Sequence, residues 1–211
     1  MTEIFDARRH WDGIYSTTQI EQTGWYEAEP TVSLELVEHC GLDLDARIAD
    51  IGSGNSTLIP ALLDRGYRNL VAVDISGVAL DALRQRLGDM AQYVDFVRDD
   101  MTDPQELDAI EPVSLWHDRA MLHFLTGTEE RDRYRAAIRA LVDPAGHAIL
   151  GEFADDGAEE CSGLPVVRFN EAALDRALGH PFRREEVVRY TYVQPSGGLR
   201  PYVYARYRHR R

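Results

Sequence analysis

The chain has 211 residues, of which 44% are apolar and 28% are charged, and its formal net charge is −13. This length suits one domain with a full hydrophobic core, and the composition is ordinary for a globular protein, so we expect a single domain over residues 1–211. The negative charge would repel a phosphate backbone, which argues against nucleic acid as a partner.

The sequence also argues against a membrane segment and against a metal site. No apolar run approaches the ~18 residues of a membrane span, and residues 1–6 do not resemble a signal peptide. The two cysteines, Cys40 and Cys161, have no metal-ligand spacing, so we expect free thiols and no bound metal. These features together predict a cytoplasmic protein.

The first predicted region covers residues 1–45 and is mainly helical. It contains a dense group of large aromatic residues, Trp11, Tyr15, Trp25 and Tyr26, before any predicted strand. A helical pattern begins near Val32 and ends near Gly41. One interpretation of the aromatic residues is that they pack an N-terminal helix onto a sheet.

The most informative stretch lies at residues 48–54. An apolar run ends at Gly52 and Gly54 and is followed by a helical pattern, which predicts a buried strand, a tight turn and a helix N-terminus. Glycine tolerates positive φ and lets a ligand lie against bare backbone. About twenty residues later Asp74 ends the next predicted strand, where a carboxylate can accept hydrogen bonds from both hydroxyls of a ribose. This pattern predicts a nucleoside-binding crevice.

The residues around the turn separate two classes of nucleoside ligand. A dinucleotide fingerprint, Gly-x-Gly-x-x-Gly, requires a third glycine at the position of Thr57. Asp50 lies two residues before the first glycine, and its carboxylate would oppose a pyrophosphate but suits a ligand with an ammonium and a sulfonium. An NAD-dependent enzyme is therefore disfavoured, although it stays an alternative.

The pattern Asp50-x-Gly52-x-Gly54 followed by Asp74 resembles motifs I and II of class I S-adenosylmethionine-dependent methyltransferases. The general pattern has a further glycine at the position of Ser56, and this Gly-Asn-Ser variant is similar to the lysine methyltransferases acting on elongation factor 1A and to related bacterial proteins. The resemblance implies a three-layer α/β Rossmann-like fold with a seven-stranded sheet, mostly parallel with an antiparallel last strand. It also implies S-adenosyl-L-methionine as cofactor and S-adenosyl-L-homocysteine as product. The residues it places against the cofactor here are Asp50, Gly52, Ser53, Gly54, Asn55, Ser56, Asp74 and Ile75.

Two further cofactor contacts are implied by the resemblance. In the family, an acid after the third strand accepts a hydrogen bond from the adenine amino group, beside a backbone N–H that meets the ring. Here this implies Asp100 and Met101, with Asp99 as an alternative one residue earlier. In related methyltransferases an aromatic N-terminal segment folds over the cofactor, which implies a lid formed by Trp25 and Tyr26.

The second informative stretch follows the fourth predicted strand, residues 113–116. The segment 117–126 resembles motif IV of many class I methyltransferases and, closely, a group of uncharacterised bacterial ones. Ligands gather at the carboxyl ends of such strands, so we expect this segment to face the methyl group. The candidate catalytic residues are His123, Asp118 and His117. The two histidines are the candidate proton acceptors, because an unperturbed histidine titrates near neutrality. On a helix Asp118 and His123 would lie about 140° apart, so a dyad would require a loop, and a structural role for each histidine is the alternative.

The remaining elements complete the expected fold. Residues 154–166 are polar, lack periodicity and are predicted to form a loop on the substrate side. The other predicted elements are a helix at 131–141, a strand at 147–153, a helix at 171–178 and an antiparallel hairpin of 182–193 with 201–208.

In-line methyl transfer requires no metal, and it mainly requires that nucleophile, methyl and sulfur be held collinear at ~3–3.5 Å without water. The leading interpretation is methyl transfer to a small-molecule acceptor, because the chain has few residues beyond the core fold that could bind a protein substrate. A protein lysine methyltransferase is the alternative, since the negative field would attract a basic protein substrate. A cofactor-binding protein without catalysis is a further alternative.

Overall fold

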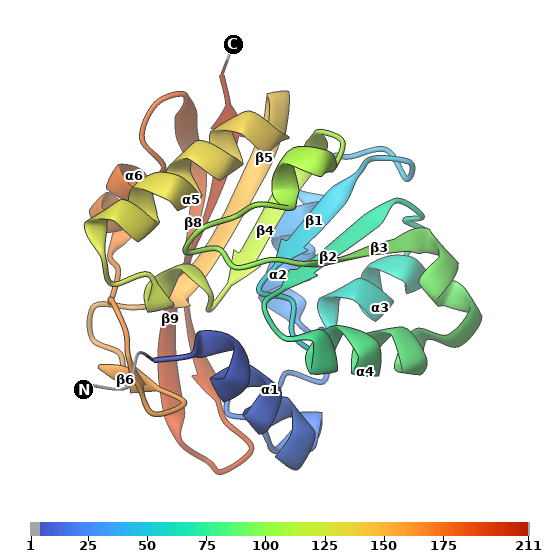
Figure 1. The fold of residues 1–211 in the computed structure, drawn as a ribbon. Helices are drawn as coiled ribbons and strands as arrows, with labels where there is room; N and C mark the ends of the chain where they lie inside the picture. Colours follow the sequence, from blue (N-terminus) through green and yellow to red (C-terminus); the bar gives the residue numbers. More distant parts are fainter. Residues whose placement is uncertain (1–4, 211) are drawn as a thin grey trace.

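The computed structural model describes residues 5–210 (Figure 1). Residues 1–4 and Arg211 lie outside the described part. Residues 1–4 belong to the predicted N-terminal region, and Arg211 is the last residue of the predicted domain. Seven strands form one sheet in the order β3-β2-β1-β4-β5-β9-β8. The strands are β1 (Ile48–Ile51), β2 (Leu70–Asp74), β3 (Val94–Arg98), β4 (Val113–Arg119), β5 (Val142–Phe153), β8 (Phe182–Val193) and β9 (Leu199–His209).

The direction of the strands confirms the predicted sheet. The pairs from β3 to β5 are parallel, whereas β9 pairs antiparallel with both β5 and β8. Within the seven-stranded sheet of residues 5–210, β9 is therefore the strand that runs opposite to the other six. The carboxyl ends of the parallel strands meet at one edge, where an open α/β sheet binds its ligands.

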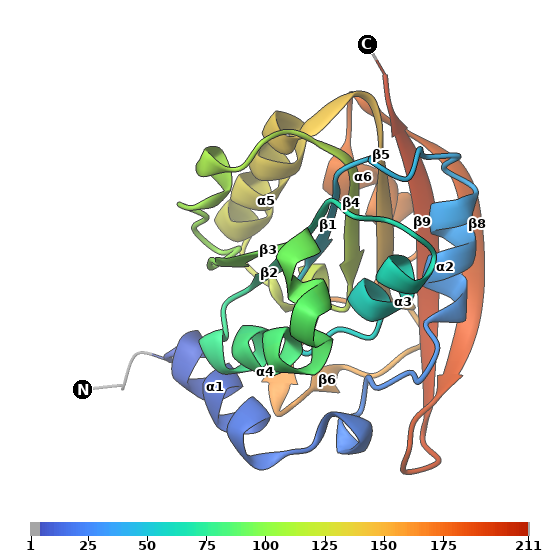
Figure 2. The same ribbon diagram turned by 90° about the vertical axis from the view of Figure 1, so that its right-hand side faces the viewer.

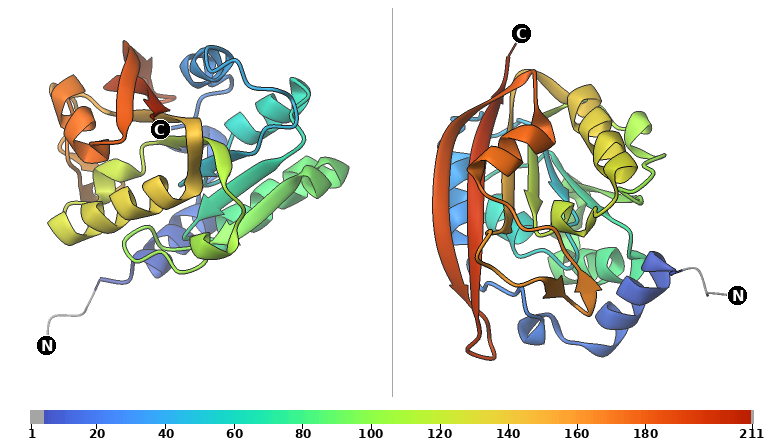
Figure 3. Two further views of the ribbon diagram at one scale, coloured as in Figure 1. Left: turned by 90° about the horizontal axis from the view of Figure 1, so that it is seen from above. Right: turned by 90° about the vertical axis from the view of Figure 1, so that its left-hand side faces the viewer.

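Helices cover both faces of the sheet and produce three layers (Figures 2 and 3). The apolar side chains of α2, α3 and α4 pack with one face, and those of α5 and α6 pack with the other. The α-helices are α1 (Ala7–Thr17), α2 (Thr31–Glu38), α3 (Leu58–Asp64), α4 (Gly77–Leu87), α5 (Thr128–Leu141) and α6 (Glu171–Leu178), and the 3-10 turns are η1 (Ile20–Gln22), η2 (Gly88–Tyr93), η3 (Leu107–Ala109) and η4 (Leu122–Phe124). In the described part of the chain no helix has the length and apolarity that a membrane span needs.

Strand β4 is longer than predicted and continues to Arg119. His117 pairs with Asp50 of β1 and Asp118 pairs with Leu150 of β5, so both residues are held in the sheet rather than in a loop. Side chains alternate along a strand, which sends His117 and Arg119 to the α2–α3 face and Asp118 to the α5 face. The predicted motif is therefore divided between two sides of the sheet.

The N-terminal helix α1 lies across the carboxyl ends of the strands (Figure 1). Its Asp12 accepts a hydrogen bond of 2.6 Å from the Ser76 hydroxyl, which attaches α1 to the first turn of α4. Trp11 of this helix packs edge-on against Trp25 and against Phe124, with ring centroids 6.0 and 5.1 Å away. The aromatic residues thus hold α1 against the edge where the cofactor was expected.

Residues 154–166 are more ordered than the sequence predicted. They contain two short antiparallel strands, β6 (Glu160–Cys161) and β7 (Leu164–Pro165). The two residues between them, Ser162 and Gly163, both have positive φ, as a two-residue hairpin turn requires. The prediction missed this hairpin because each strand is too short for a visible alternation.

Candidate cofactor-binding site

The glycine turn leads from β1 into α3 and lies against the end of β2. Gly52 and Gly54 have φ of 64° and 53°, and a Cβ on Gly54 would collide with the hydroxyl of Tyr15. The Gly54 N–H donates to Asp74 at 2.7 Å, and the second carboxylate oxygen of Asp74 accepts from the Ser76 N–H at 2.8 Å. Burial raises the pKa of Asp74 to about 6. The two predicted motifs are therefore in direct contact, beneath the tyrosine of α1.

Asp50 anchors a second set of contacts, which we name the Asp50 cluster: Asp50, Ser56, His117 and Ser33. The Asp50 carboxylate accepts from the Ser56 hydroxyl at 2.7 Å and lies 2.8 Å from His117 Nδ1. His117 Nε2 lies 2.9 Å from the Ser33 hydroxyl of α2. Ser56 Oγ also accepts from the backbone N–H groups of Leu58 and Ile59. Ser56 thus pairs two backbone N–H groups of the first turn of α3, a contact that a glycine at this position could not make.

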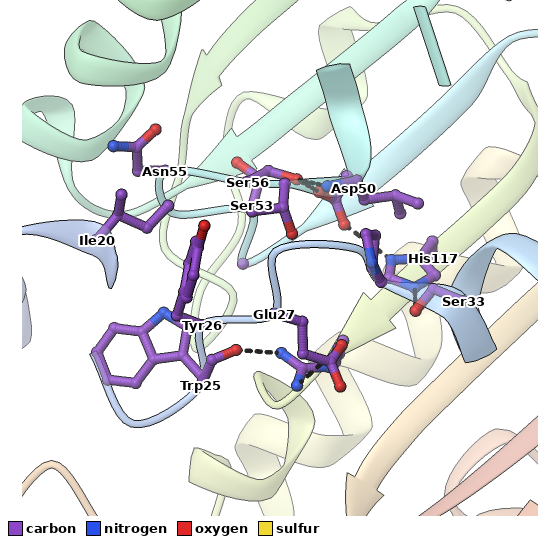
Figure 4. A pocket seen from close by; sticks show the side chains of 15 residues that line it. Ile20, Trp25, Tyr26, Glu27, Ser33, Asp50, Ser53, Asn55, Ser56 and His117 are labelled. Carbon is purple, nitrogen blue, oxygen red and sulfur yellow. Dashed lines mark hydrogen bonds and ion pairs between the residues drawn. The ribbon is translucent and has the colours of Figure 1, made fainter. Parts of the chain in front are cut away.

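A cavity of about 60 Å³ lies between the glycine turn and residues 20–33 (Figure 4). Its walls include the charged residues Glu27, Asp50 and Arg119 together with Trp25. The remaining lining residues are Ile20, Tyr26, Pro30, Ser33, Gly52, Ser53, Asn55, Ser56, Thr57, Leu58 and His117. Trp25 and His117 therefore border one hollow together with the predicted turn residues, except for Gly54, which does not line it.

Three buried polar atoms in the walls of this cavity lack a hydrogen-bond partner within residues 5–210. They are Ser53 Oγ, Asn55 Oδ1 and Arg119 Nη2. Buried polar groups are almost always paired, so an orphan requires an explanation. A polar ligand in the cavity would supply the partners, and these residues therefore fit a cofactor with charged groups.

Arg119 holds the N-terminal segment over the cavity. Its Nη1 donates to the Trp25 carbonyl at 2.9 Å, and its Nε donates to the Tyr204 hydroxyl at 2.9 Å. Its Nη2 lies 3.3 Å from the Glu27 carboxylate, an ion pair between two largely buried side chains. Burial raises the pKa of Glu27. Sequence reasoning missed Glu27, which belongs to no motif and follows the aromatic pair that drew attention.

The predicted adenine-binding residues lie at the end of β3. The Asp99 carboxylate accepts from the N–H groups of Gln105 and Glu106, and the Asp100 carboxylate accepts from Thr102. Met101 is buried in the core beneath α5. These contacts shape the loop after β3, and the assignment of Asp100 and Met101 to adenine stays a prediction. Ile75, the other predicted contact, is half-buried and its carbonyl accepts from Arg98.

On the opposite face of β4 lies a sealed group, which we name the Asp118 cluster: Asp118, His123, Tyr134 and Glu152. All four side chains are 0% exposed. The Tyr134 hydroxyl donates to Asp118 at 2.8 Å, and His123 Nδ1 lies 3.1 Å from Glu152 Oε2. Burial raises the pKa of Glu152 to about 8 and lifts the pKa of Asp118 well above its usual value. Glu152 lies between Asp118 and His123, a link that the sequence did not predict.

The candidate catalytic residues therefore have different surroundings. His117 borders the cavity, whereas Asp118 and His123 are enclosed by the core and are absent from the cavity wall in the described chain. A catalytic role for His123 or Asp118 would require the η4 turn to move. In residues 5–210, no group of three or more His, Cys, Asp or Glu side chains is arranged to hold a metal ion.

Known proteins share this sequence pattern and this fold. Residues 48–146 match the methyltransferase domain family. A mouse protein, "eEF1A lysine and N-terminal methyltransferase", is 28% identical over 194 residues, which are 91% of this chain and 26% of that protein. The chain thus spans about a quarter of the curated relatives it matches.

Two solved structures have the same architecture. A SAM-dependent methyltransferase from Anabaena variabilis superposes with a TM-score of 0.78 and 15% identity, over 96% of this chain and 93% of that one. The N-methyltransferase NodS from Bradyrhizobium japonicum, in complex with S-adenosylhomocysteine, superposes with a TM-score of 0.71 and 16% identity, over 97% and 99%. The match over 48–146, the glycine turn and the strand order agree with one another, and together they support a class I S-adenosylmethionine-dependent methyltransferase.

Proposed function

We propose that this protein transfers a methyl group from S-adenosylmethionine to a nitrogen atom of a cationic small molecule. A groove of about 440 Å³ lies beside the cofactor cavity, within the ~300–1,000 Å³ typical of small-molecule sites. Its lining residues are Glu21, Tyr26, Glu27, Ala28, Glu29, Tyr190, Tyr192, Val193 and Pro195. Carboxylates and tyrosine faces both attract an ammonium group.

One observation carries the proposal: Glu27 and Tyr26 line both the groove and the cavity. A ligand in the groove therefore borders the ligand in the cavity at these two residues. Tyr190 and Tyr192 lie near the carboxyl end of β8, at the same edge of the sheet as the glycine turn. This position supports a role of the groove in binding the acceptor.

The residues of the chain have separate tasks in this proposal. When bound, S-adenosylmethionine supplies a methyl group on a positively charged sulfur. Glu21 and Glu29 attract the acceptor cation, and Glu27 orients it at the junction. An ammonium must lose its proton before the nitrogen can attack, and a carboxylate with a raised pKa, such as Glu27, suits that task. Trp25 and Tyr26 exclude water from the junction.

The remaining predicted contacts belong to the same proposal. Asp74 holds the ribose, Asp100 and Met101 hold the adenine, and residues 154–166 contribute to the substrate side. His117, through Asp50, positions the glycine turn, while His123 and Asp118 support the η4 turn. NodS and the mouse relative are both named for methylation at nitrogen, which supports a nitrogen acceptor.

A lysine side chain of a basic protein is the second candidate acceptor. It carries the same ammonium, and the Gly54-Asn55-Ser56 turn together with the mouse relative supports it. The experiment is methyl incorporation from labelled S-adenosylmethionine into a cell lysate, before and after removal of small molecules. Label in the small-molecule fraction is expected, label in protein would select the alternative, and no label in either would count against the proposal.

A variant pair makes that experiment specific to the groove. Glu27→Gln should lower incorporation by about tenfold or more, since it removes one charge-assisted contact to the acceptor. Glu129→Gln, at an exposed carboxylate of α5 that pairs with Arg133, is the control and should leave incorporation unchanged. An equal rate in both variants would show that the groove does not bind the acceptor.

A further inference from the structure

We propose that Tyr192 and Gln194 are positioning residues that couple the acceptor groove to the cofactor cavity. They hold the backbone of residues 24–26, a segment that supplies walls to both hollows. A ligand in either hollow should therefore raise the affinity of the other hollow for its own ligand. The inference rests on the proposed function, because it takes the groove as the acceptor site.

The connection between α1 and α2 contains little regular structure of its own. In residues 18–30 the regular element is the 3-10 turn η1. Backbone N–H and C=O groups outside helices and strands take their hydrogen-bond partners from other parts of the fold. The position of this connection therefore depends on bonds that distant elements supply.

Three consecutive carbonyl groups of the connection accept hydrogen bonds from distant side chains. The Gly24 carbonyl accepts from Gln194 Nε2 at 3.0 Å, and the Tyr26 carbonyl accepts from the Tyr192 hydroxyl. Between them, the Trp25 carbonyl is held by a side chain of β4 (Figure 4). Tyr192 lies near the end of β8 and Gln194 directly follows that strand, at the tip of the β8–β9 hairpin, which lies beside the connection (Figures 1 and 2). Two of the three bonds thus come from one hairpin.

The hairpin and the connection fit closely. A Cβ on Gly24 would lie 2.7 Å from the Gln194 amide nitrogen, so a side chain at position 24 would displace the amide. The Gln194 backbone N–H donates to the Gly198 carbonyl, and its carbonyl accepts from the Gly197 N–H, both at 2.8 Å. Tyr192 is buried, with 5% of its surface exposed. Both donors are therefore held in place by the hairpin itself, and neither requires a ligand for its orientation.

The walls of the groove come from both sides of this contact. Residues 21–29 supply one wall and residues 190–195 supply the other. Tyr26 and Glu27 of the first wall also line the cofactor cavity. A ligand that contacts both walls of the groove binds best when the connection lies against the hairpin, and the same arrangement encloses the cavity. Each ligand thus favours the form of the protein that the other ligand prefers, and by thermodynamic linkage the two effects are equal.

The test measures how strongly one ligand changes the affinity for the other. Calorimetric titration with S-adenosylhomocysteine is carried out in tetramethylammonium chloride and in sodium chloride at the same ionic strength. Tetramethylammonium has the charge that carboxylates and tyrosine faces attract, and its nitrogen has no lone pair with which to accept a methyl group. S-adenosylhomocysteine lacks the transferable methyl group, so no reaction disturbs the measurement. Titration of the protein with tetramethylammonium, with and without S-adenosylhomocysteine, gives the reciprocal effect.

A double variant, Tyr192→Phe/Gln194→Ala, removes both hydrogen bonds of the hairpin and keeps an aromatic ring in the groove. The matched control is Tyr207→Phe/Gln92→Ala. The Tyr207 hydroxyl donates to Asp175 of α6 at 3.1 Å, and the Gln92 amide donates to a backbone carbonyl of η2 at 2.9 Å. Each variant therefore loses one bond from a tyrosine hydroxyl and one from a glutamine amide. Circular dichroism melting establishes that each variant is folded.

Tetramethylammonium should raise the affinity for S-adenosylhomocysteine about fivefold or more in the wild type and in the control. In Tyr192→Phe/Gln194→Ala this factor should fall below about twofold, because each lost hydrogen bond is worth about 2- to 10-fold. Both ligands should still bind this variant separately. An unchanged factor in the double variant would overturn the inference, since the coupling would then arise from direct contact between the two ligands.

The wild type provides a test that depends on no variant. If both ligands bind and neither changes the affinity for the other, the inference alone is overturned. Weaker binding of S-adenosylhomocysteine in tetramethylammonium would also overturn it, because the two ligands would then compete for one hollow. Failure of either ligand to bind would count against the proposed function as well. If the double variant does not fold, the milder change Tyr192→Phe takes its place, with Tyr207→Phe as its control.

Discussion

Two buried polar clusters lie on opposite faces of the sheet at the same end of β4. His117 belongs to the Asp50 cluster and the next residue, Asp118, belongs to the Asp118 cluster. The first borders a cavity, whereas the second is completely enclosed. Among the described residues, buried polar atoms without a hydrogen-bond partner occur at both places. The difference teaches that a buried titratable residue marks a ligand site only where open space lies beside it.

The clusters also differ in how their acids are stabilised. Asp50 keeps a hydroxyl donor, Ser56, and a histidine ring, His117, at hydrogen-bond distance. In the Asp118 cluster burial raises the pKa of Glu152 to about 8, so its neutral form predominates near pH 7, and burial raises the pKa of Asp118 as well. The first cluster suits a cationic ligand and the second suits a rigid core.

The largest expected effect concerns the stability of the enclosed cluster. Glu152→Ala removes the acceptor of the His123 N–H and leaves a void, which should lower the free energy of unfolding by ~2–5 kcal/mol. Urea denaturation measures this loss. Glu159→Ala at the surface is the control and should stay within ~0.5 kcal/mol of the wild type. A loss below that limit for Glu152→Ala would show that the enclosed cluster is not a stabilising unit.

A matched pair of isosteric changes should separate the two clusters by ligand affinity. Asp50→Asn removes the negative charge at the cavity and should weaken S-adenosylhomocysteine binding by ~1.5–3 kcal/mol, or about 10- to 100-fold. Asp118→Asn changes an enclosed side chain that does not border the cavity and should leave the affinity unchanged. Calorimetry measures both affinities. Similar losses of affinity in both variants would show that the two clusters do not differ in ligand binding.

The enclosed cluster should also give stability a characteristic pH dependence. Glu152 binds its proton more tightly in the folded state, so the unfolded state loses that proton first as pH rises above ~4.5. Stability should therefore fall between about pH 4.5 and pH 8, at up to ~1.4 kcal/mol per pH unit from this group. Glu152→Gln should flatten the slope of unfolding free energy between pH 5.5 and pH 8. An unchanged slope would mean that Glu152 titrates normally.

The smallest expected effect concerns turnover. His123→Gln should leave the methyl-transfer rate within about threefold of the wild type, less than ~1 kcal/mol in activation free energy, because its ring borders no open space. His117→Gln should weaken cofactor binding through the loss of its contact with Asp50. Initial rates at saturating cofactor provide the measurement. A hundredfold or larger loss of rate in His123→Gln would show that His123 takes part in the reaction.

Local signals in the sequence were sufficient for much of the fold. Helix α6 (Glu171–Leu178) and strand β8 (Phe182–Val193) have the bounds that were predicted. The Asn170 side chain caps α6 and Gly179 follows its last residue, so both ends were readable without tertiary contacts. The contact between Gly54 and Asp74 was equally accessible, because a known motif spacing describes it.

The parts that sequence reasoning missed depend on long-range contacts. Glu27 gains its importance from Arg119, which lies 92 residues later in the chain and reaches it only when β4 is placed in the sheet. Glu152 became visible as the link between Asp118 and His123 only after β5 was paired with β4. No local pattern distinguishes such residues from ordinary charged side chains. Their roles arise from strand order, which periodicity alone does not specify.

The way α1 and residues 20–33 cover the glycine turn has a kinetic consequence. The Tyr15 hydroxyl rests on Gly54, and the covered cavity measures about 60 Å³, much less than a whole nucleoside cofactor needs. For a cofactor that occupies this cavity, we predict that it enters, and that the spent product leaves, when this segment swings outward. Each catalytic cycle would then include two openings of this segment, and the frequency of that motion would limit the overall rate.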